Sequence, residues 1–305
     1  MNARETLIKK TKGIRNAVLP GFDGAPLELV AKLIVKGLFG RGVLVTRASS
    51  IAFNMLIALL PATIFLFTLI PFIPIPNFQT ELVHLFENFL PVTAYTFMET
   101  TIVDVITNRS GTLLVVMFFA TIIFSTNGIH ALMHAFNVSV HDFQSRSWIQ
   151  QRKIAVIILI FILILFSAAG LLIILSRSVV DRLVELDVLE MNLVFYLVMI
   201  FKWILIVAML FFAISTLFYL VPAHKKDFRF ISPGSIVATT LFIITSLGFS
   251  AYVNDFGQYN KLYGSIGTLI VILIWLYLNS IALLVGFELN VSIKAANGSK
   301  DPEDH

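Results

Sequence analysis

Polar or ionisable residues lie within or at the ends of the long apolar runs of this 305-residue chain, and seven of them are candidates for a common site. Such side chains are rare within a bilayer because burying them there costs free energy, and those that occur commonly line a binding site or a water-filled path. Counting about 1.5 Å of helical rise per residue places all seven toward the same, cytoplasmic side of their helices. We therefore predict a cytoplasm-facing polar vestibule formed by Asn54, Asn127, His130, His134, Thr240, Glu288 and Asn290.

Glu288 is the one carboxylate in this set, and it closes the apolar segment 263–290, YGSIGTLIVILIWLYLNSIALLVGFELN. If the last span ends at residue 288, the helix dipole opposes a carboxylate there by about 0.3–1 kcal/mol. A lysine or arginine would suit that place better. We therefore expect Glu288 to have a partner or a role: either a salt bridge, for example with a Lys or Arg of segment 26–42, or a ligand or proton site.

Two further features could carry chemistry. His130 and His134 are four residues apart and share a helix face, as in helical zinc sites. The segment HALMH lacks the glutamate of HExxH, and His141 or Asn127 would have to supply a third ligand, so we predict no metal. The histidines either line a wet vestibule or pack at an interface. Lys202 lies in the outer half of its span and either snorkels to the outer surface or forms a cation in an outer cavity.

The composition determines the elements that must position these residues. Hydrophobic residues make up 58% of the chain and charged residues 13%, against about 25% in soluble domains. The chain has no cysteine, which excludes disulfides and thiol chemistry. Six uncharged runs are long enough to cross a bilayer, and they lack the alternation of barrel strands, so an all-α fold is predicted. The runs are 51–73, 112–136, 154–175, 193–221, 234–253 and 266–288.

The distribution of Lys and Arg predicts the orientation of these spans. The N-terminal segment, alternate loops and tail hold 17 of them, and the intervening loops hold 4. Because cytoplasmic loops carry the excess of positive charge, both termini are predicted to be cytoplasmic, in a bacterial inner membrane. The first 50 residues include nine basic residues and no apolar run with a cleavage site, so we expect no signal peptide.

Two segments outside the spans have a pattern of their own. In segment 26–42, Val30, Ile34 and Leu38 share one helix face and Glu28, Lys32 and Lys36 the other, which predicts an amphipathic helix. It either lies on the inner leaflet, with Lys32, Lys36 and Arg41 at lipid head groups, or forms an elbow leading into the first span. Segment 78–107 is too polar to span and is predicted to form two short helices that cap the outer side, with a re-entrant element as the alternative. The predicted organisation is thus a cytoplasmic segment 1–48, a membrane domain 49–291 and a tail 292–305.

The C-terminal third resembles the signature end of the YihY/BrkB family of bacterial inner-membrane proteins. The matching features are a loop with Tyr259, Tyr263 and Gly264, the Trp275–Tyr277 step and the closing Gly286–Asn290. The first span, with its Arg47–Phe53 entry and Leu59–Pro61, and the second span's exit, Gly128–Asn137, are similar too. The resemblance implies six spans and an inner-membrane location. Members have been called ribonuclease BN, a label now regarded as mistaken, serum-resistance factors and transporters of lipid-like substrates.

These observations favour a transporter or flippase-like protein for an amphiphilic or small anionic solute, with membrane lipids as partners. The chain shows no triad, phosphate loop or nucleic-acid-binding motif, so we expect neither enzyme activity nor nucleic-acid binding, and no cofactor. The alternative is a non-catalytic scaffold of the cell envelope. An intramembrane hydrolase, including a ribonuclease, is disfavoured. Nothing in the sequence predicts the oligomeric state or names a substrate.

Overall fold

The computed structural model describes residues 21–22, 24–40, 44–72, 110–139, 146–185, 193–222, 229–255 and 259–298. All regular structure in these ranges is helical, which confirms the predicted all-α class. Six helices of the described ranges are long and apolar enough to cross a membrane. The predicted outer cap 78–107 and Arg41 lie outside these ranges, and the predicted orientation of the termini stays a prediction.

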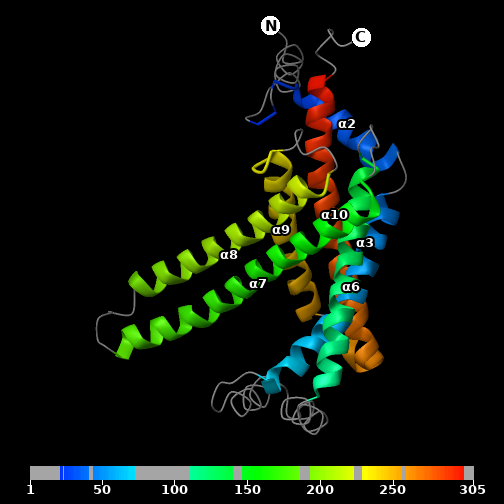
Figure 1. The fold of residues 1–305 in the computed structure, drawn as a ribbon. Helices are drawn as coiled ribbons and strands as arrows, with labels where there is room; N and C mark the ends of the chain where they lie inside the picture. The colour runs from blue at the N-terminus through cyan, green and yellow to red at the C-terminus, as the bar shows by residue number, and fades with distance from the viewer. Residues whose placement is uncertain are drawn as a thin grey trace. The chain divides into compact units, whose positions relative to one another are not determined.

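A shorter helix, α2 (Leu27–Gly40), precedes the six long ones (Figure 1). The six are α3 (Leu44–Leu69), which ends in the 3₁₀ turn η1 (Ile70–Phe72), α6 (Gly111–Asn137), α7 (Trp148–Glu185), α8 (Leu193–Leu220), α9 (Pro233–Asp255) and α10 (Tyr259–Gly298). Each contains most or all of one predicted span. The helix α10 continues ten residues beyond Glu288, so the dipole argument made for that carboxylate does not apply.

The chain divides into two compact units. Residues 54–128 form one unit, from the later part of α3 to the first part of α6. Within it, Phe65 and Phe118 are in tilted ring contact at 5.7 Å. Gly128 lies against the backbone of Asn54 and Met55, so the two helices approach closely there.

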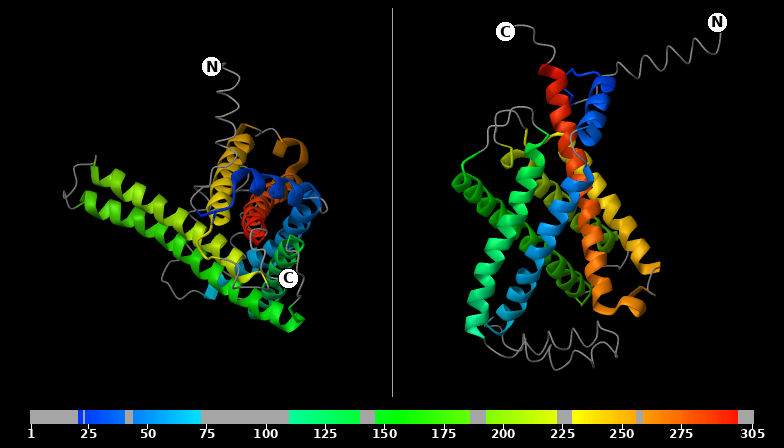
Figure 2. Two further views of the ribbon diagram at one scale, coloured as in Figure 1. Left: turned by 90° about the horizontal axis from the view of Figure 1, so that it is seen from above. Right: turned by 90° about the vertical axis from the view of Figure 1, so that its right-hand side faces the viewer.

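Residues 1–53 and 129–305 form the other unit, which contains most of the helical packing. The helices α7 and α8 lie side by side as an antiparallel pair, and α10 contacts both α9 and α2 (Figure 2). Arg146, just before α7, donates hydrogen bonds to the carbonyls of Leu220, Val221 and Pro222 at the end of α8. Partial burial lowers the pKa of this guanidinium, which still carries the positive charge that favours a helix C-terminus.

Small residues allow α9 and α10 to approach closely. A Cβ added to Gly286 would lie 2.5 Å from both Ala238 Cβ and the Gly234 carbonyl oxygen, too close for any side chain. Farther along the pair, Trp275 Nε1 donates to Ser246 Oγ at 3.2 Å. Close backbone approach and hydrogen bonds between helices are the usual means by which helices associate in lipid, where the hydrophobic effect does not drive them together.

The apolar face predicted for segment 26–42 is buried in the structure. Val30 and Leu38 are 1% and 7% exposed, and a core cluster joins Val30 to Leu289, Ile293 and Ala296 of α10. The opposite face remains exposed: it carries Lys32, whose ammonium pairs with Glu28 at 2.9 Å, as well as Val35, Lys36 and Phe39. The helix α2 is therefore attached to the last ten residues of α10, and its Lys32 faces outward.

Candidate functional site

Glu288 lies where four helix segments meet. Its side chain is 3% exposed, and it is surrounded by α2, the start of α3, the segment that ends α6, and α10 itself. Gly37 of α2 lies directly against the carboxylate, and a Cβ at that position would overlap it. The absence of a side chain at residue 37 thus makes the space that Glu288 occupies.

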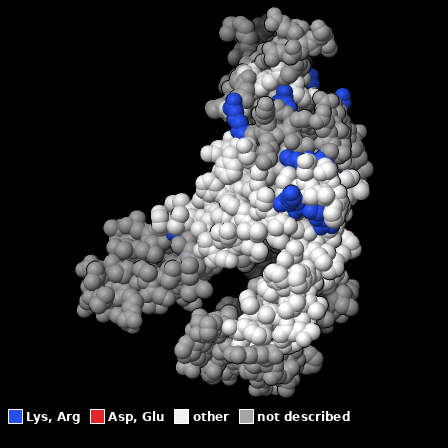
Figure 3. All heavy atoms as spheres, in the orientation of Figure 1, with Lys and Arg blue, Asp and Glu red and all other residues white. Residues whose placement is uncertain are grey.

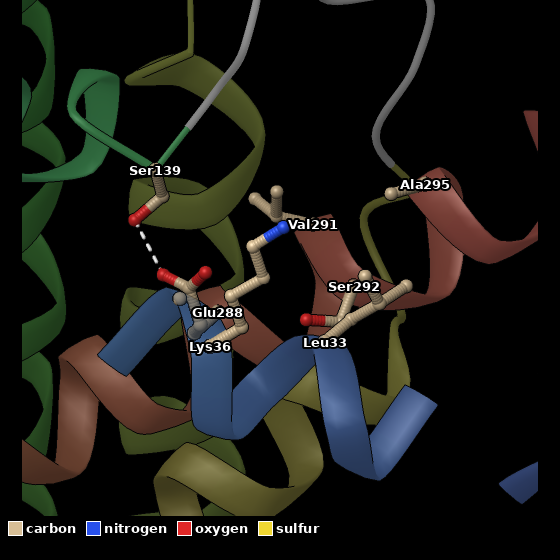
Figure 4. A pocket seen from close by; sticks show the side chains of 8 residues that line it. Leu33, Lys36, Ser139, Glu288, Val291, Ser292 and Ala295 are labelled. Carbon is tan, nitrogen blue, oxygen red and sulfur yellow. Dashed lines mark hydrogen bonds between the residues drawn. The ribbon is translucent and has the colours of Figure 1, made fainter. Parts of the chain in front are cut away.

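An Arg–Ser–Glu chain of contacts holds this carboxylate, and Figure 4 draws its Ser139–Glu288 hydrogen bond. Ser139 Oγ donates to Glu288 Oε2 at 2.6 Å. Arg47, in the first turn of α3, donates from Nη2 to Ser139 Oγ at 2.5 Å. Arg47 Nη1 lies 3.8 Å from Glu288 Oε2, an ion pair longer than a hydrogen bond. Ser139 therefore bridges two opposite charges that do not meet directly.

The electrostatics of this chain make it costly to disturb. Arg47 is 7% exposed, so both charges of the pair have lost most of their water. Its Nε and Nη1 atoms have no hydrogen-bond acceptor in the described structure. Removing one member of a buried ion pair leaves the other charge uncompensated, at a typical cost of about 3–5 kcal/mol. The ion pair therefore adds little net stability to the fold, but replacing either charged residue alone should destabilise it.

A small pocket of about 40 Å³ lies beside Glu288. It is lined by Leu33, Lys36, Gly37, Ser139, Glu288, Val291, Ser292 and Ala295. A water molecule needs about 10–15 Å³ by this measure, so the pocket holds roughly two or three. The Lys36 side chain extends from α2 across the pocket, while Glu288 and Ser139 form another part of its wall (Figure 4). Water, a proton or a small charged group suits this lining.

Three fully buried aromatic rings pack next to the carboxylate. Phe136 of α6 stacks on Phe287 of α10 with a centroid distance of 4.1 Å and an interplanar angle of 7°. Phe218 of α8 meets both rings edge-on, at 5.6 Å. Because buried aromatic side chains pack closely, this cluster holds α6, α8 and α10 together beside Glu288.

Asn290 does not line the pocket but forms hydrogen bonds with the start of α9. Its Oδ1 accepts from the Gly234 backbone N–H at 2.8 Å, and its Nδ2 donates to Ser232 Oγ at 2.8 Å. Ser232 and Ser235 bond reciprocally, as residues of an N-terminal capping box do. Asn290 therefore completes the N-terminal cap of α9 and ties it to α10, which is a structural task.

Of the seven residues predicted to line one vestibule, Glu288 alone lines this pocket. Thr240 is exposed and donates to the Ile236 carbonyl of its own helix. His134 is exposed, and His130 is half-buried outside the pocket lining. Asn54 and Asn127, both half-buried, belong to the other compact unit.

Lys202 lies outside the pocket lining, and the three residues of the matching loop, Tyr259, Tyr263 and Gly264, belong to α10. Lys202 is half-buried, donates to Met199 Sδ at 3.2 Å and lies 5.9 Å from the Trp203 ring centroid. Tyr259, Tyr263 and Gly264 lie in the first two turns of α10, where the structure describes the helix and no side chains. On the face drawn in Figure 3, most of the described Lys and Arg side chains lie in the upper half of the picture, and no described acidic side chain shows there.

The sequence analysis did not single out Arg47, Ser139 or Ser292 as site residues. Arg47 was counted among the nine basic residues of the first 50 and as the start of the Arg47–Phe53 match to the family, but it was not predicted to be a site residue. The partner expected for Glu288 was a cation of segment 26–42. The structure instead gives Arg47, six residues farther along the chain than Arg41, in the first turn of α3.

Six helices of the described ranges are long and apolar enough to cross a membrane, which defines the class of multi-pass α-helical membrane proteins. Residues 38–305 match the family described as virulence factor BrkB, and the chain belongs to this family. It is 30% identical over 245 residues to the ribonuclease-like protein YfkH of Bacillus subtilis, covering 80% of this chain and 88% of that one.

Shorter matches join the chain to other membrane proteins. It is 36% identical over 87 residues to a UPF0761 membrane protein of Pseudoalteromonas translucida, which is 28% of this chain and 29% of the relative. A UPF0761 membrane protein of Stenotrophomonas maltophilia is 35% identical over 85 residues, or 28% and 20% of the two chains. No solved structure matches.

Proposed function

We propose that this protein is a transporter or flippase-like protein, and not an enzyme, for an amphiphilic or small anionic solute. The buried Arg47–Ser139–Glu288 chain beside a pocket of mixed polar and apolar lining carries the proposal. Apolar residues of similar volume commonly stabilise a fold as well as a buried ion pair does, or better. Ionisable groups within membrane helices commonly mark the path of a substrate or ion, and this pair fits that pattern.

The position of the pair favours transport over a purely structural task. Its members come from α3, α10 and the end of α6, and Gly37 of α2 lies against them. A change in the charge or contacts of Glu288 therefore affects four chain segments together. At about 40 Å³ the pocket is too small for a lipid head group, so binding one requires the walls to move. Movement of this kind between two arrangements is what transport needs.

The name of the Bacillus relative suggests hydrolysis of RNA, which would need a positioned base together with an acid or a metal. The part of the chain that the structure describes holds no group of three His, Cys, Asp or Glu residues placed to bind a metal ion. Glu288, the carboxylate of the site, is engaged by Ser139 and Arg47. These features give hydrolysis no support.

The test is reconstitution of the purified protein into vesicles that carry fluorescent phosphatidylglycerol in one leaflet, with fluorescent phosphatidylcholine in a parallel sample. A membrane-impermeant quencher then reports how fast each lipid changes leaflet. We expect the protein to accelerate movement of the anionic lipid. Equal rates with and without protein, both for these lipids and for small anions trapped inside the vesicles, would overturn the proposal and favour an envelope scaffold.

A further inference from the structure

We infer that Glu288 is an internal counter-anion of Arg47, and that an anionic group replaces it there only when Glu288 takes up a proton. An anion and a proton then enter the site together, one for one. This rests on the proposed function and adds to it the charge of the ligand and the coupled ion. Two independent features carry the inference: unused donors on Arg47, and a water-sized pocket against Glu288.

Arg47 has the capacity to bind a second anion. A guanidinium presents five N–H donors in a fork that fits an oxyanion. Nη2 donates to Ser139, while Nε and Nη1 have no acceptor among the described residues although the side chain is only 7% exposed. A buried donor without a partner is unfavourable, because it has lost its hydrogen bonds to water. The paired edges of a guanidinium are Nε with Nη2 and Nη1 with Nη2, so an oxyanion placed on either edge of Arg47 would accept from one of these two unsatisfied atoms.

The pocket supplies a route to that guanidinium. Ser139 and Glu288 line it, and both contact Arg47. Rotation of the Glu288 side chain away from Ser139 would extend the pocket to Arg47. The Lys36 ammonium extends across the pocket and attracts anions toward it (Figure 4).

Charge balance explains why a proton must accompany the anion. The described pair Arg47 and Glu288 is neutral as a unit. A second anion is repelled by the ionised Glu288 carboxylate, because two negative charges that lie close together in a site of low dielectric repel each other strongly. A proton from water on the Glu288 carboxylate removes that repulsion and leaves Arg47 to the anion, so the site stays neutral. Ser139 then donates its hydroxyl hydrogen to the anion instead of to Glu288.

Other charged or titratable side chains near the site must be separated from this effect. Lys36 on α2 lines the pocket, Arg47 lies on α3, and Lys294 on α10 is exposed two residues beyond Ser292. On α6, His134 is exposed five residues before Ser139. Histidines commonly change charge between pH 5 and 8, so His134→Gln is a necessary control.

The decisive experiment measures proton uptake on anion binding. The probe is octanesulfonate, whose own charge is constant over the useful pH range, added to the full-length protein in nanodiscs of phosphatidylcholine. A pH-indicator dye reports the protons taken up, and calorimetry reports the anion bound. For the wild type we expect about one proton per anion, with affinity rising about tenfold for each unit of falling pH while Glu288 titrates. Methanesulfonate in a second series distinguishes a free anion from a head group carried on an apolar chain.

The variants assign the effect to residues. Glu288→Gln imitates the protonated acid, so it should bind octanesulfonate without proton uptake and with an affinity independent of pH. Arg47→Gln should lose binding. Glu28→Gln, an acid on α2 away from the pocket, and His134→Gln should behave like the wild type.

Binding of the anion by the wild type without proton uptake would overturn the inference, as would the absence of binding or an unchanged pH profile in Glu288→Gln. The wild-type measurements decide the matter even if a variant fails to fold. Vesicle transport that does not depend on pH would remove the coupling and leave the proposed function standing. Proton-coupled binding without any transport would overturn the proposed function and leave the coupled binding of proton and anion standing.

Discussion

At the scale of single residues, the site depends on three side chains that are far apart in the sequence. Arg47 and Ser139 are separated by 92 residues, and Ser139 and Glu288 by 149. No local pattern joins them. Glu288 was identifiable from the sequence because a carboxylate is conspicuous in an apolar run. Arg47 and Ser139 were not, because an arginine before a span and a serine after one are ordinary residues.

The buried charge pair makes a prediction about stability. Arg47→Gln and Glu288→Gln should each lower the free energy of unfolding by about 3–5 kcal/mol, because each leaves a buried charge without its partner. The double variant carries both substitutions and therefore neither charge, so it should lose less than the sum of the two. Thermal or denaturant unfolding in detergent measures the wild type and the three variants. Additive losses would show that the two charges do not interact.

Asn290 makes a second prediction at this scale. Asn290→Ala removes the acceptor for the Gly234 N–H and the donor to Ser232, and should cost about 1–3 kcal/mol of stability. Asn290→Asp keeps the acceptor, and a carboxylate is favourable at a helix N-terminus, so it should cost less. The same unfolding assay compares them. An equal loss in both variants would contradict the capping role.

At the scale of elements, the long helices could be predicted from length and apolarity alone, and their ends could not. The helix α10 continues to Gly298 because its last turns bury Val291, Ile293 and Ala296, partly against α2. That contact is tertiary, and no hydropathy pattern within α10 shows it. The predicted vestibule likewise depended on contacts that the sequence does not show. Thr240 is polar, but its hydroxyl is satisfied by the carbonyl of Ile236 in its own helix, so it needs no polar partner elsewhere.

The close packing of α9 on α10 predicts that one glycine is far less tolerant than another. In Gly286→Ala the new methyl group meets Ala238 and the Gly234 carbonyl, so the helices must separate. We expect a loss of stability of about 1–3 kcal/mol, the size typical of overpacking, measured by thermal unfolding. In Gly248→Ala nothing lies within 4 Å of the added Cβ, and alanine favours the helix. Gly248→Ala should therefore be neutral or stabilising, and equal effects of the two substitutions would contradict the observed packing.

At the scale of the whole molecule, the distribution of basic residues predicts the orientation in the membrane. The chain has no cysteine, so single cysteines can be introduced into it without a background signal. Lys294→Cys, at an exposed position of α10, should resist a membrane-impermeant maleimide in intact cells and react once the inner membrane is opened. Arg109→Cys, in the first loop expected outside, should react in both cases. The opposite pattern would invert the predicted topology.

The central claim is that the Glu288 site acts in transport and does not merely hold the fold together. The most direct test compares the leaflet exchange of fluorescent phosphatidylglycerol by the wild type, Glu288→Gln and Glu28→Gln, each reconstituted in equal folded amounts. Glu28→Gln should match the wild type. Glu288→Gln should be slower by about tenfold or more, equivalent to about 1.4 kcal/mol of barrier, because Arg47 can no longer exchange the bound anion for its internal carboxylate. Exchange by folded Glu288→Gln at the wild-type rate would contradict the account.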